Sequence, residues 1–497
     1  MLLVLTAMLW GANAQDARYL AQRATLRQER QAIQILADKD RQTRAGQAAK
    51  EIRLLIDVAA KAPGAWQRPT LEGLVSGLAR QDPALAATLT GELAPLTGDG
   101  EPPRAERSAW EKKVDAARRR ICAPLEEFCQ RAVNAGVIDV AYDQMLQVLA
   151  YWPEHPDLHR NLGLQKVGDR WYGPRDLERV RGGMTWVGDL GWIFTKERKR
   201  YEAGDYFDPQ SRVWTTLAKA NAAHGTWKSP WILSTEHLEI RGTAPLGELV
   251  GAAEALERFY TRVFGAYANF FAPGGKGDLR LVFGLAQHPR LLVNIGKDEA
   301  DYQAGLPPGT DAGWSAGMFI PRIPASFFYA GPPELYYHEF THQILHVFSN
   351  GNQAPAWLCE GVAVYSQAPR YSGGGLEFGD VAGNQHLQGF IRDPKLRLPL
   401  ARILDLSDQQ AWNAATHPEA NYASAGMLVQ FCMEADKRAM RADFIDFLRD
   451  SYRGQTNDHP LNQYLGLSQN DLEERFAAWC TKLVAQVVDR EAPTPAP

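Results

Sequence analysis

The stretch YYHEFTHQIL, residues 336–345, carries two histidines four residues apart and a glutamate directly after the first of them. Two prolines and a glutamate at 332–334 precede it, and these residue types favour the first turn of a helix. The sequence NGN at 350–352 ends the helical pattern. The stretch is therefore predicted to form a helix, on which His338 and His342 emerge from the same face, one turn apart.

This histidine pair has the spacing to bind one Zn²⁺ ion through two neutral ring nitrogens, at about 2.0–2.1 Å. Glu339 adjoins the first histidine, so its carboxylate would reach a zinc-bound water without ligating the metal. It would act as the general base that takes the proton of the water and passes it to the leaving amine. A catalytic zinc also needs a third protein ligand and a fourth position that stays open for water.

Glu360 is the candidate for the third ligand. It lies eighteen residues after His342, within APAWLCEGVAVYSQ (354–367), a segment that begins after a turn and has helical character. A helix–turn–helix of this length can bring a carboxylate of the second helix back towards the first. Two neutral imidazoles and one carboxylate leave the metal site with a net positive charge, so the ion still acidifies its water and polarises a carbonyl.

HEFTH followed at this distance by WLCEGVAVY resembles the gluzincin clan of zinc metallopeptidases. The form W-L-x-E-G-x-A-x-Y is most similar to the uncharacterised, exported gluzincin-like families. The resemblance covers residues 225–485 and implies a zinc metallopeptidase that acts on a peptide or protein substrate. It implies that His338, His342 and Glu360 hold the metal and that Glu339 is the catalytic base.

The chain departs from better-known gluzincins at two places. Val364, four residues after Glu360, stands where thermolysin-like enzymes place an aspartate that orients a histidine ligand, so another group must orient it here. The strand SAGMF, which begins at residue 315, lacks the glutamate with which aminopeptidases of the clan hold the free amine of the substrate. Aminopeptidase specificity is therefore not supported, although 315–320 could pair as an edge strand with an extended peptide.

A peptidase of this kind also needs a hydrogen-bond donor to the tetrahedral oxyanion. Tyr422, in HPEANYASAGMLVQF (417–431), lies about sixty residues after Glu360, where aminopeptidase-like relatives carry such a tyrosine. His417 is the rival donor. A phenol that only packs at a helix start is the structural alternative for Tyr422.

Two further residues near the motif are expected to be structural. His346 lies one turn beyond His342, but the glycine and the longer spacing of a metzincin third histidine are missing. We expect His346 to be a packing residue or to support a ligand. Cys359 adjoins Glu360 and points about 100° away from it on a helix, so we expect it to be structural.

The composition is that of a soluble globular protein of two to four domains, with 497 residues, of which 45% are hydrophobic and 23% charged. The 54 basic and 58 acidic residues give a formal net charge of -4, which provides no field of one sign to recruit nucleic acid or an anionic membrane. Five cysteines do not make a disulfide framework. Cys122 and Cys129 lie seven apart on a predicted helix, too far for a bridge, and are expected to be buried free thiols.

The N-terminal run MLLVLTAMLWGANA is apolar and ends in small residues, with Ala12 and Ala14 in the A-x-A arrangement of a signal-peptidase site. It is too short for a permanent membrane anchor. We therefore expect export to the periplasm or the extracellular space, with cleavage near Ala14 and no integral membrane span. The run lacks the usual basic start, and a buried N-terminal helix is the alternative.

The predicted fold class is α+β. A helical N-terminal half, which includes one tetratricopeptide-like unit at 135–163, is followed by a small mixed sheet, the histidine-bearing helix and a C-terminal helical subdomain. The predicted divisions are a signal peptide (1–14), a helical region (15–163), two hairpin–helix repeats (164–210), a gluzincin-like zinc peptidase domain (225–487) and a disordered tail (488–497).

The two repeats are VGDRWYGPRDLERVRGG (167–183) and VGDLGWIFTKERKRYEAG (187–204), each with a turn, an aromatic strand end and a charged helix that ends in glycine. Their tryptophans Trp171 and Trp192 could grip a ligand, but aromatic residues in so small a module more often form its core.

Strands and helices alternate in the second half of the chain. Residues 231–242 and 278–286 are predicted strands, with an amphipathic helix at 246–271 between them. Two shorter strands are predicted at 315–321 and 326–330.

The sequence thus favours an exported zinc metallopeptidase. The alternative is a catalytically degenerate gluzincin-like domain that binds partners or organises the cell envelope, with the N-terminal helical half as the surface for a protein partner. The intact ligand set together with Glu339 favours the enzyme, because a binding domain has no need of the base. A purely structural zinc site is less favoured, because such sites use four protein ligands.

Overall fold

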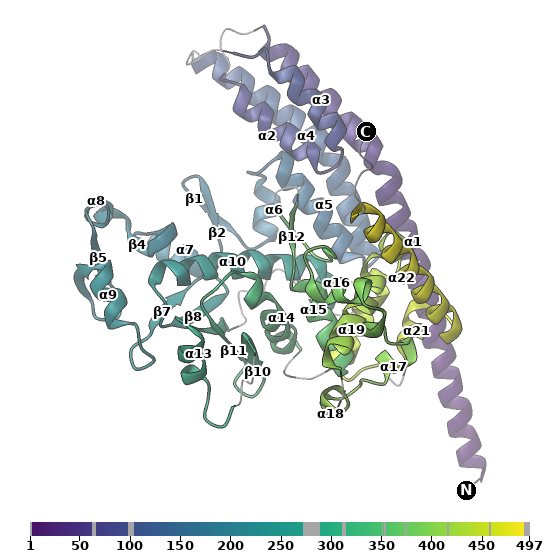
Figure 1. Cartoon of the computed structure of the whole chain (residues 1–497). Coiled ribbons are helices and arrows are strands. Elements are labelled where there is room, and N and C mark those ends of the chain that lie inside the picture. The colour runs from purple at the N-terminus through teal and green to yellow at the C-terminus, as the bar shows by residue number, and fades with distance from the viewer. Residues whose placement is uncertain are drawn as a thin grey trace, which may run out of the picture. The chain divides into compact units, whose positions relative to one another are not determined.

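The computed structural model describes residues 2–61, 66–97, 104–271, 289–310, 315–349, 351, 354–372, 375–414, 417–456 and 459–491 (Figure 1). These residues form two compact units, the first ending at Leu162 and the second beginning at Gly163. The strand predicted at 278–286 and the last six residues of the predicted tail, 492–497, lie outside the described residues.

The described part of the first unit is helical, as predicted for the N-terminal half. Ala45, Ala48 and Ile52 lie on one face of the first helix at helical spacing, and they share a buried core with Leu71 of the second helix and Ile121 of the fourth. Residues 2–14, the predicted signal peptide, are helical and continue into the first helix, and their cleavage remains a prediction. The helices are α1 (Leu2–Ala59), α2 (Arg68–Ala79), α3 (Pro83–Leu93), α4 (Arg104–Asn134), α5 (Ile138–Tyr151) and α6 (Pro156–Asn161).

Helices α5 and α6 and the turn between them make the single helix–turn–helix that the sequence predicts at 135–163. The thiols of α4 face the neighbouring helix α5. Cys122 Sγ lies 4.0 Å from the carbonyl oxygen of Val148, and Cys129 Sγ lies 3.3 Å from that of Ala141. All five cysteines are free, as predicted for the first two.

The second unit begins with three hairpin–helix modules, of which the sequence predicted the first two. In the third module, Asp208 accepts hydrogen bonds from the backbone of Gln210 and Ser211 in the turn, and the turn residue with positive φ is Arg212 instead of a glycine. This different turn chemistry explains why the third module was missed. The modules are β1 (Gln165–Val167), β2 (Arg170–Tyr172) and α7 (Pro174–Arg181); β3 (Met184–Val187), β4 (Gly191–Phe194) and α8 (Arg198–Glu202); and β5 (Asp205–Asp208), β6 (Val213–Thr216) and α9 (Leu217–Ala223).

Tryptophans of the second module pack inside it. The rings of Trp186 and Trp192 meet edge to face with centroids 5.5 Å apart, and the guanidinium of Arg179 lies 5.2 Å from the Trp192 ring. The indole nitrogen of Trp186 donates a hydrogen bond to Glu254, at 2.8 Å, which ties the module to the long helix that follows. Trp192 therefore contributes to a structural core, the more frequent role of such aromatic residues.

A five-stranded mixed sheet follows, with strand order β10-β11-β9-β8-β7. Strand β9 pairs in parallel with β8 and β11, whereas the outer pairs β7–β8 and β10–β11 are antiparallel. The short strands predicted at 315–321 and 326–330 are confirmed as β10 and β11, and β10 is an edge strand. The strands are β7 (Trp231–Ser234), β8 (Leu238–Gly242), β9 (Leu291–Gly296), β10 (Gly317–Ile320) and β11 (Ala325–Tyr329).

The sheet corrects the sequence analysis at two places. Residues 231–242 form a hairpin of two strands instead of one strand, because Glu257 of α10 (Leu246–Ala266) accepts hydrogen bonds at the turn from the hydroxyl of Thr235 and the backbone N–H of His237. Strand β9, at the centre of the sheet, was not predicted. Its sequence LLVNIG is a short, almost fully buried run without the alternation that marks a half-exposed strand.

Side chains of β11 alternate between two helices, one on each face of the sheet. Ser326 donates a hydrogen bond to Gln343 of α14 (Glu334–Phe348), at 2.9 Å, and Phe328 contacts Tyr336 of the same helix. Phe327 and Ala325 point the other way, into a cluster with Tyr302 of α13 (Glu299–Gly305). The predicted histidine-bearing helix is thus α14, and it begins after Pro332 and Pro333 as expected.

The rest of the second unit is mostly helical, as predicted. Among the described residues, no helix combines the length and the apolar character needed to cross a membrane. The remaining elements are α11 (Ala268–Phe271), α15 (Ala356–Ser366), β12 (Arg370–Ser372), β13 (Gly375–Glu377), α16 (Gln385–Arg392), α17 (Leu400–Leu404), α18 (Gln409–Asn413), α19 (Pro418–Arg438), α20 (Arg441–Tyr452), α21 (Leu461–Leu465) and α22 (Gln469–Glu491).

Helices α15 and α19 approach each other closely at two glycines. A Cβ on Gly361 of α15 would lie 2.7 Å from the carbonyl oxygen of Ala425, which belongs to α19. A Cβ on Gly426 of α19 would lie 2.4 Å from Cγ1 of Val364. Both distances are far below van der Waals contact, so only glycine allows this packing. Because Gly361 directly follows Glu360, the packing also fixes the position of the Glu360 side chain.

We expect the substitution Gly361→Ala to destabilise the protein by about 1–3 kcal/mol, because the added methyl group would force the two helices apart. Urea denaturation would measure the free energy of unfolding. The control is Gly251→Ala on α10, where a Cβ meets nothing within 4 Å. That substitution should stabilise the helix by about 0.5–1 kcal/mol, as alanine does in place of glycine. Equal effects of the two substitutions would contradict the close packing of α15 and α19.

Candidate metal centre

The structure brings His338 and His342 of α14 together with Glu360 of α15. The Nε2 atoms of the two histidines are 3.2 Å apart, and Glu360 Oε2 lies 3.2 Å from His338 Nε2 and 3.4 Å from His342 Nε2. Ligand atoms at the corners of a tetrahedron with bonds of about 2.0–2.1 Å are about 3.3 Å apart, so the three atoms fit a zinc ion. Within the described residues, His338, His342 and Glu360 are the one group of three or more histidine, cysteine, aspartate or glutamate side chains whose ligand atoms lie close enough together to hold a metal ion. We call these three residues the ligand group.

The electrostatics of this cluster follow from a half-buried carboxylate between two imidazoles. Burial alone would raise the pKa of Glu360, but the charges and hydrogen bonds of His342 and His338 lower it well below its usual range. Burial alone would lower the pKa of His338, but the hydrogen bond to Glu360 and the charges of Glu339 and Glu360 raise it to about 9. In the metal-free protein, a proton on His338 therefore balances the charge of Glu360.

Val364 stands where an aspartate was expected to orient a histidine ligand, so another group must do so. The contact of the second ring nitrogen of His338 identifies that group. His338 Nδ1 donates a hydrogen bond to Oε1 of Gln367, at 2.8 Å, directly after the C-terminus of α15. Val364 itself is fully buried against Gly426. A glutamine seven residues after Glu360 thus contacts His338 in place of the aspartate expected four residues after it.

Glu339 lies outside the ligand group and faces the edge of the sheet. Its Oε2 accepts a hydrogen bond from the backbone N–H of Phe319 in β10, at 2.8 Å. The carboxylate is therefore held between α14 and the edge strand β10, and Glu339 directly follows His338 in the sequence. This is where a base that does not ligate the metal would have to lie.

Tyr422 of α19 packs against the same cluster. Its ring centroid lies 6.2 Å from that of His338, and it stacks on His386 at 5.2 Å and meets Trp412 edge to face at 5.0 Å. Burial raises the pKa of Tyr422, and the charge of Glu360 raises it further, so the phenol keeps its proton and can donate it. His417, the rival donor, is exposed at the N-cap of α19 and is not among the rings that contact Tyr422 in the described structure.

His386 of α16 was not identified from the sequence. Asn384 accepts hydrogen bonds from the backbone of His386 and Leu387, and its Nδ2 donates to the carbonyl oxygen of Val364, at 2.6 Å. This link fixes α16 against α15 and places the imidazole beside Tyr422. Burial and the charge of His338 lower the pKa of His386 to about 4, so the ring is neutral at neutral pH. A single histidine without motif spacing gave no signal that could have identified it.

His346 and Cys359 are placed as structural residues. The ring of His346 meets that of Phe319 at 5.2 Å and bonds to the backbone of Pro321, away from the ligand group. Cys359 Sγ lies 3.3 Å from the carbonyl oxygen of Ala354, and burial raises its pKa to about 11. Neither residue supplies a fourth ligand.

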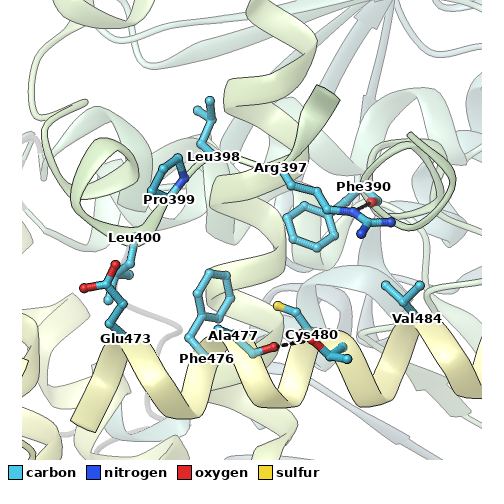
Figure 2. Close-up of a pocket in the computed structure, with 11 residues that line it drawn as sticks. Phe390, Arg397, Leu398, Pro399, Leu400, Glu473, Phe476, Ala477, Cys480 and Val484 are labelled. Carbon is cyan, nitrogen blue, oxygen red and sulfur yellow. Dashed lines mark hydrogen bonds between the residues drawn. The ribbon is translucent and has the colours of Figure 1, made fainter. Parts of the chain in front are cut away.

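A separate cavity of about 240 Å³ lies between α22 and the segment that joins α16 to α17 (Figure 2). No residue of the ligand group lines it. The guanidinium of Arg397 is bonded to the carbonyl oxygens of Phe390 and Ile391, and burial raises the pKa of Cys480 to about 12. The cavity therefore presents an apolar surface and no activated nucleophile. It is lined by Phe390, Arg397, Leu398, Pro399, Leu400, Glu473, Phe476, Ala477, Cys480, Thr481 and Val484.

Comparison of the chain with protein-family models, curated proteins and solved structures finds no match in any of the three. What the site can do therefore follows from its own residues and their geometry.

The raised pKa of His338 predicts that zinc binding depends on pH. An imidazole must lose its proton before it ligates a metal, and a group with a pKa of about 9 keeps that proton at neutral pH. We expect zinc affinity to rise about tenfold per pH unit from pH 7 towards 9 and to level off above it. Competition with a chromophoric chelator at several pH values would measure the affinity.

The control for this experiment is His417→Gln, which changes an exposed histidine outside the ligand group. It should keep both the affinity and its pH dependence. A zinc affinity that does not change between pH 7 and 9 would contradict the proton on His338.

Proposed function

We propose that the chain is a zinc-dependent peptidase, with His338, His342 and Glu360 as the metal ligands and Glu339 as the general base. The observation that supports it most strongly is the convergence of the three ligand atoms, at 3.2–3.4 Å from one another, beside a glutamate that is not part of the set. The resemblance of HEFTH and WLCEGVAVY to the gluzincin clan adds to this observation.

The donor set favours a catalytic over a structural metal. Structural zinc sites are closed by four protein ligands, often cysteines, whereas catalytic sites keep one position open. Cys359, the cysteine nearest in sequence, faces the carbonyl oxygen of Ala354. Two imidazoles and one carboxylate are also the ligands of the zinc in thermolysin-type enzymes. A bound zinc would lower the pKa of water and polarise the carbonyl of the substrate.

Glu339 would take a proton from the attacking water and pass it to the amine of the leaving group. The hydrogen bond from Phe319 orients one carboxylate oxygen, which leaves the other to accept the proton. Tyr422 would donate a hydrogen bond to the oxyanion that forms at the carbonyl carbon. Its raised pKa keeps the phenol protonated for this role.

The substrate would be an extended peptide that pairs with β10 on the side away from β11, where the described part of the chain has no further strand. In an antiparallel edge strand, alternate residues turn their N–H and C=O groups away from the sheet, and Phe319 does so towards Glu339. The apolar N-terminal run with Ala12 and Ala14 supports a protein that is exported. The helical first unit, with its tetratricopeptide-like α5–α6 pair, would offer a surface for a protein partner.

The alternative is a degenerate domain that binds partners without catalysis. Such a domain would keep the fold and could keep the metal ligands. It would have no reason to hold Glu339 in a fixed orientation beside an open metal position. The two hypotheses therefore predict different effects of replacing Glu339: the enzyme would lose activity, whereas the binding domain has no activity to lose.

We expect Glu339→Gln to retain about one zinc per chain and to lose peptide hydrolysis by a factor of about 10²–10⁴ or more, because the amide cannot accept the proton of the water. Inductively coupled plasma mass spectrometry would measure the zinc content, and cleavage of a broad peptide library would measure the hydrolysis. Zinc binding without any hydrolysis by the unchanged protein would favour the binding domain. Absence of zinc from carefully prepared protein would exclude the zinc-dependent enzyme and any form of the binding domain that holds a metal.

We expect Tyr422→Phe to lower kcat about 10²–10³-fold, the cost of losing one oxyanion donor, and to leave zinc content unchanged. The matched control is Tyr371→Phe, which removes a phenol from an exposed residue of β12. It should leave kcat unchanged. Full activity of the Tyr422→Phe variant would assign the donor elsewhere, with His386 as the next residue to test.

A further inference from the structure

Gln367 and Glu360 contact the same imidazole ring, that of His338. Gln367 caps the C-terminus of α15 with helical backbone angles, and it lies seven residues, or two turns of helix, after Glu360, so the two side chains project from the same side. Glu360 contacts His338 Nε2 at 3.2 Å, and Gln367 accepts a hydrogen bond from Nδ1 of the same ring at 2.8 Å. One helix therefore binds the imidazole at both of its nitrogens.

We propose that Gln367 is the positioning residue that selects the tautomer of His338 for metal binding. A neutral imidazole has one N–H, and an acceptor at Nδ1 keeps the hydrogen there and leaves the lone pair of Nε2 facing the ligand group. Only the oxygen of the amide can accept this hydrogen bond. The inference rests on the metal centre of the proposed function, but not on peptidase activity.

Other side chains near the ring cannot take this role. Val364 carries no polar atom and is buried against Gly426. Tyr422 meets the ring of His338 at a tilt of 59°, with centroids 6.2 Å apart. Glu360 and His342 lie on the Nε2 side. Within the described residues, Gln367 is the partner of His338 Nδ1.

The choice of an amide over a carboxylate changes the charge of the site. Two neutral imidazoles and one carboxylate around Zn²⁺ give a net charge of about +1, and a neutral glutamine preserves it. A carboxylate at the same position would cancel this charge, as well as make the imidazole a stronger ligand. Gln367 therefore orients His338 while it leaves the metal more able to attract electrons from water and from a carbonyl.

The test compares Gln367→Met, which keeps the length of the side chain and removes the acceptor, with Gln367→Glu, which keeps the acceptor. The full-length, metal-free proteins would be titrated with Zn²⁺ in competition with a chromophoric chelator. We expect Gln367→Met to weaken zinc binding about 10–100-fold, the usual effect of losing such a partner. Gln367→Glu should bind zinc at least as tightly as the unchanged protein.

The control is Gln388→Met on α16, whose amide donates to the carbonyl oxygen of Val381 and to no ligand. It should leave zinc affinity unchanged. The thermal unfolding temperature of each metal-free variant would be measured as well, and it should not differ between the Met and Glu variants at 367. A merely structural role would lower this temperature without separating the two variants in zinc affinity.

Equal zinc affinity of Gln367→Met and the unchanged protein would overturn the inference, and so would an equal loss in Gln367→Glu and Gln367→Met. If Gln367→Met weakens zinc binding, Gln367→Glu does not, and the unchanged protein cleaves no peptide, the inference is upheld while the proposed function fails. Failure of the unchanged protein to bind zinc would overturn both.

Discussion

The half-buried carboxylate of Glu360, with its side chain 14% exposed, is the group on which the site depends. A charge removed from water is costly unless an opposite charge or a metal compensates it. Two imidazoles from α14 surround this carboxylate, at 3.2 and 3.4 Å, and in the metal-free protein a proton on His338 balances it. A zinc ion would replace that proton. The same cluster is thus compatible with both states.

The position of Glu360 is set by packing on the other side of its helix. Gly361 and Gly426 let α15 and α19 approach until backbone and side chains touch, and Asn384 ties α16 to α15 through the carbonyl oxygen of Val364. Helix α19 also carries Tyr422, so one helix interface places both a candidate metal ligand and the candidate oxyanion donor. The C-terminal helices therefore serve the site as a scaffold, although the histidine motif belongs to α14.

Local signals made α14 predictable, because the prolines, the histidine spacing and the end of the pattern all fall within about twenty residues. Glu360 could be inferred because its motif resembles a clan. Strand β9 could not, since a short run buried on both faces has no period of its own. The turn at Thr235 depends on Glu257, some twenty residues away, and Gln367 and His386 reach the cluster only through the packing of α15 and α16. What the sequence missed is therefore what depends on contacts between elements.

The edge strand and the base are joined by one hydrogen bond, from the N–H of Phe319 to Glu339. This N–H points away from β11, at the edge of the sheet as the described strands form it, where an extended peptide would form its own hydrogen bonds. A peptide that pairs there would lie alongside Glu339, and it would compete for the same N–H. Under the proposed function, alignment of the substrate and orientation of the base would share one backbone group, because the same N–H would serve a paired peptide and one carboxylate oxygen of Glu339. Phe319 would thus link the place where a peptide binds to the orientation of Glu339.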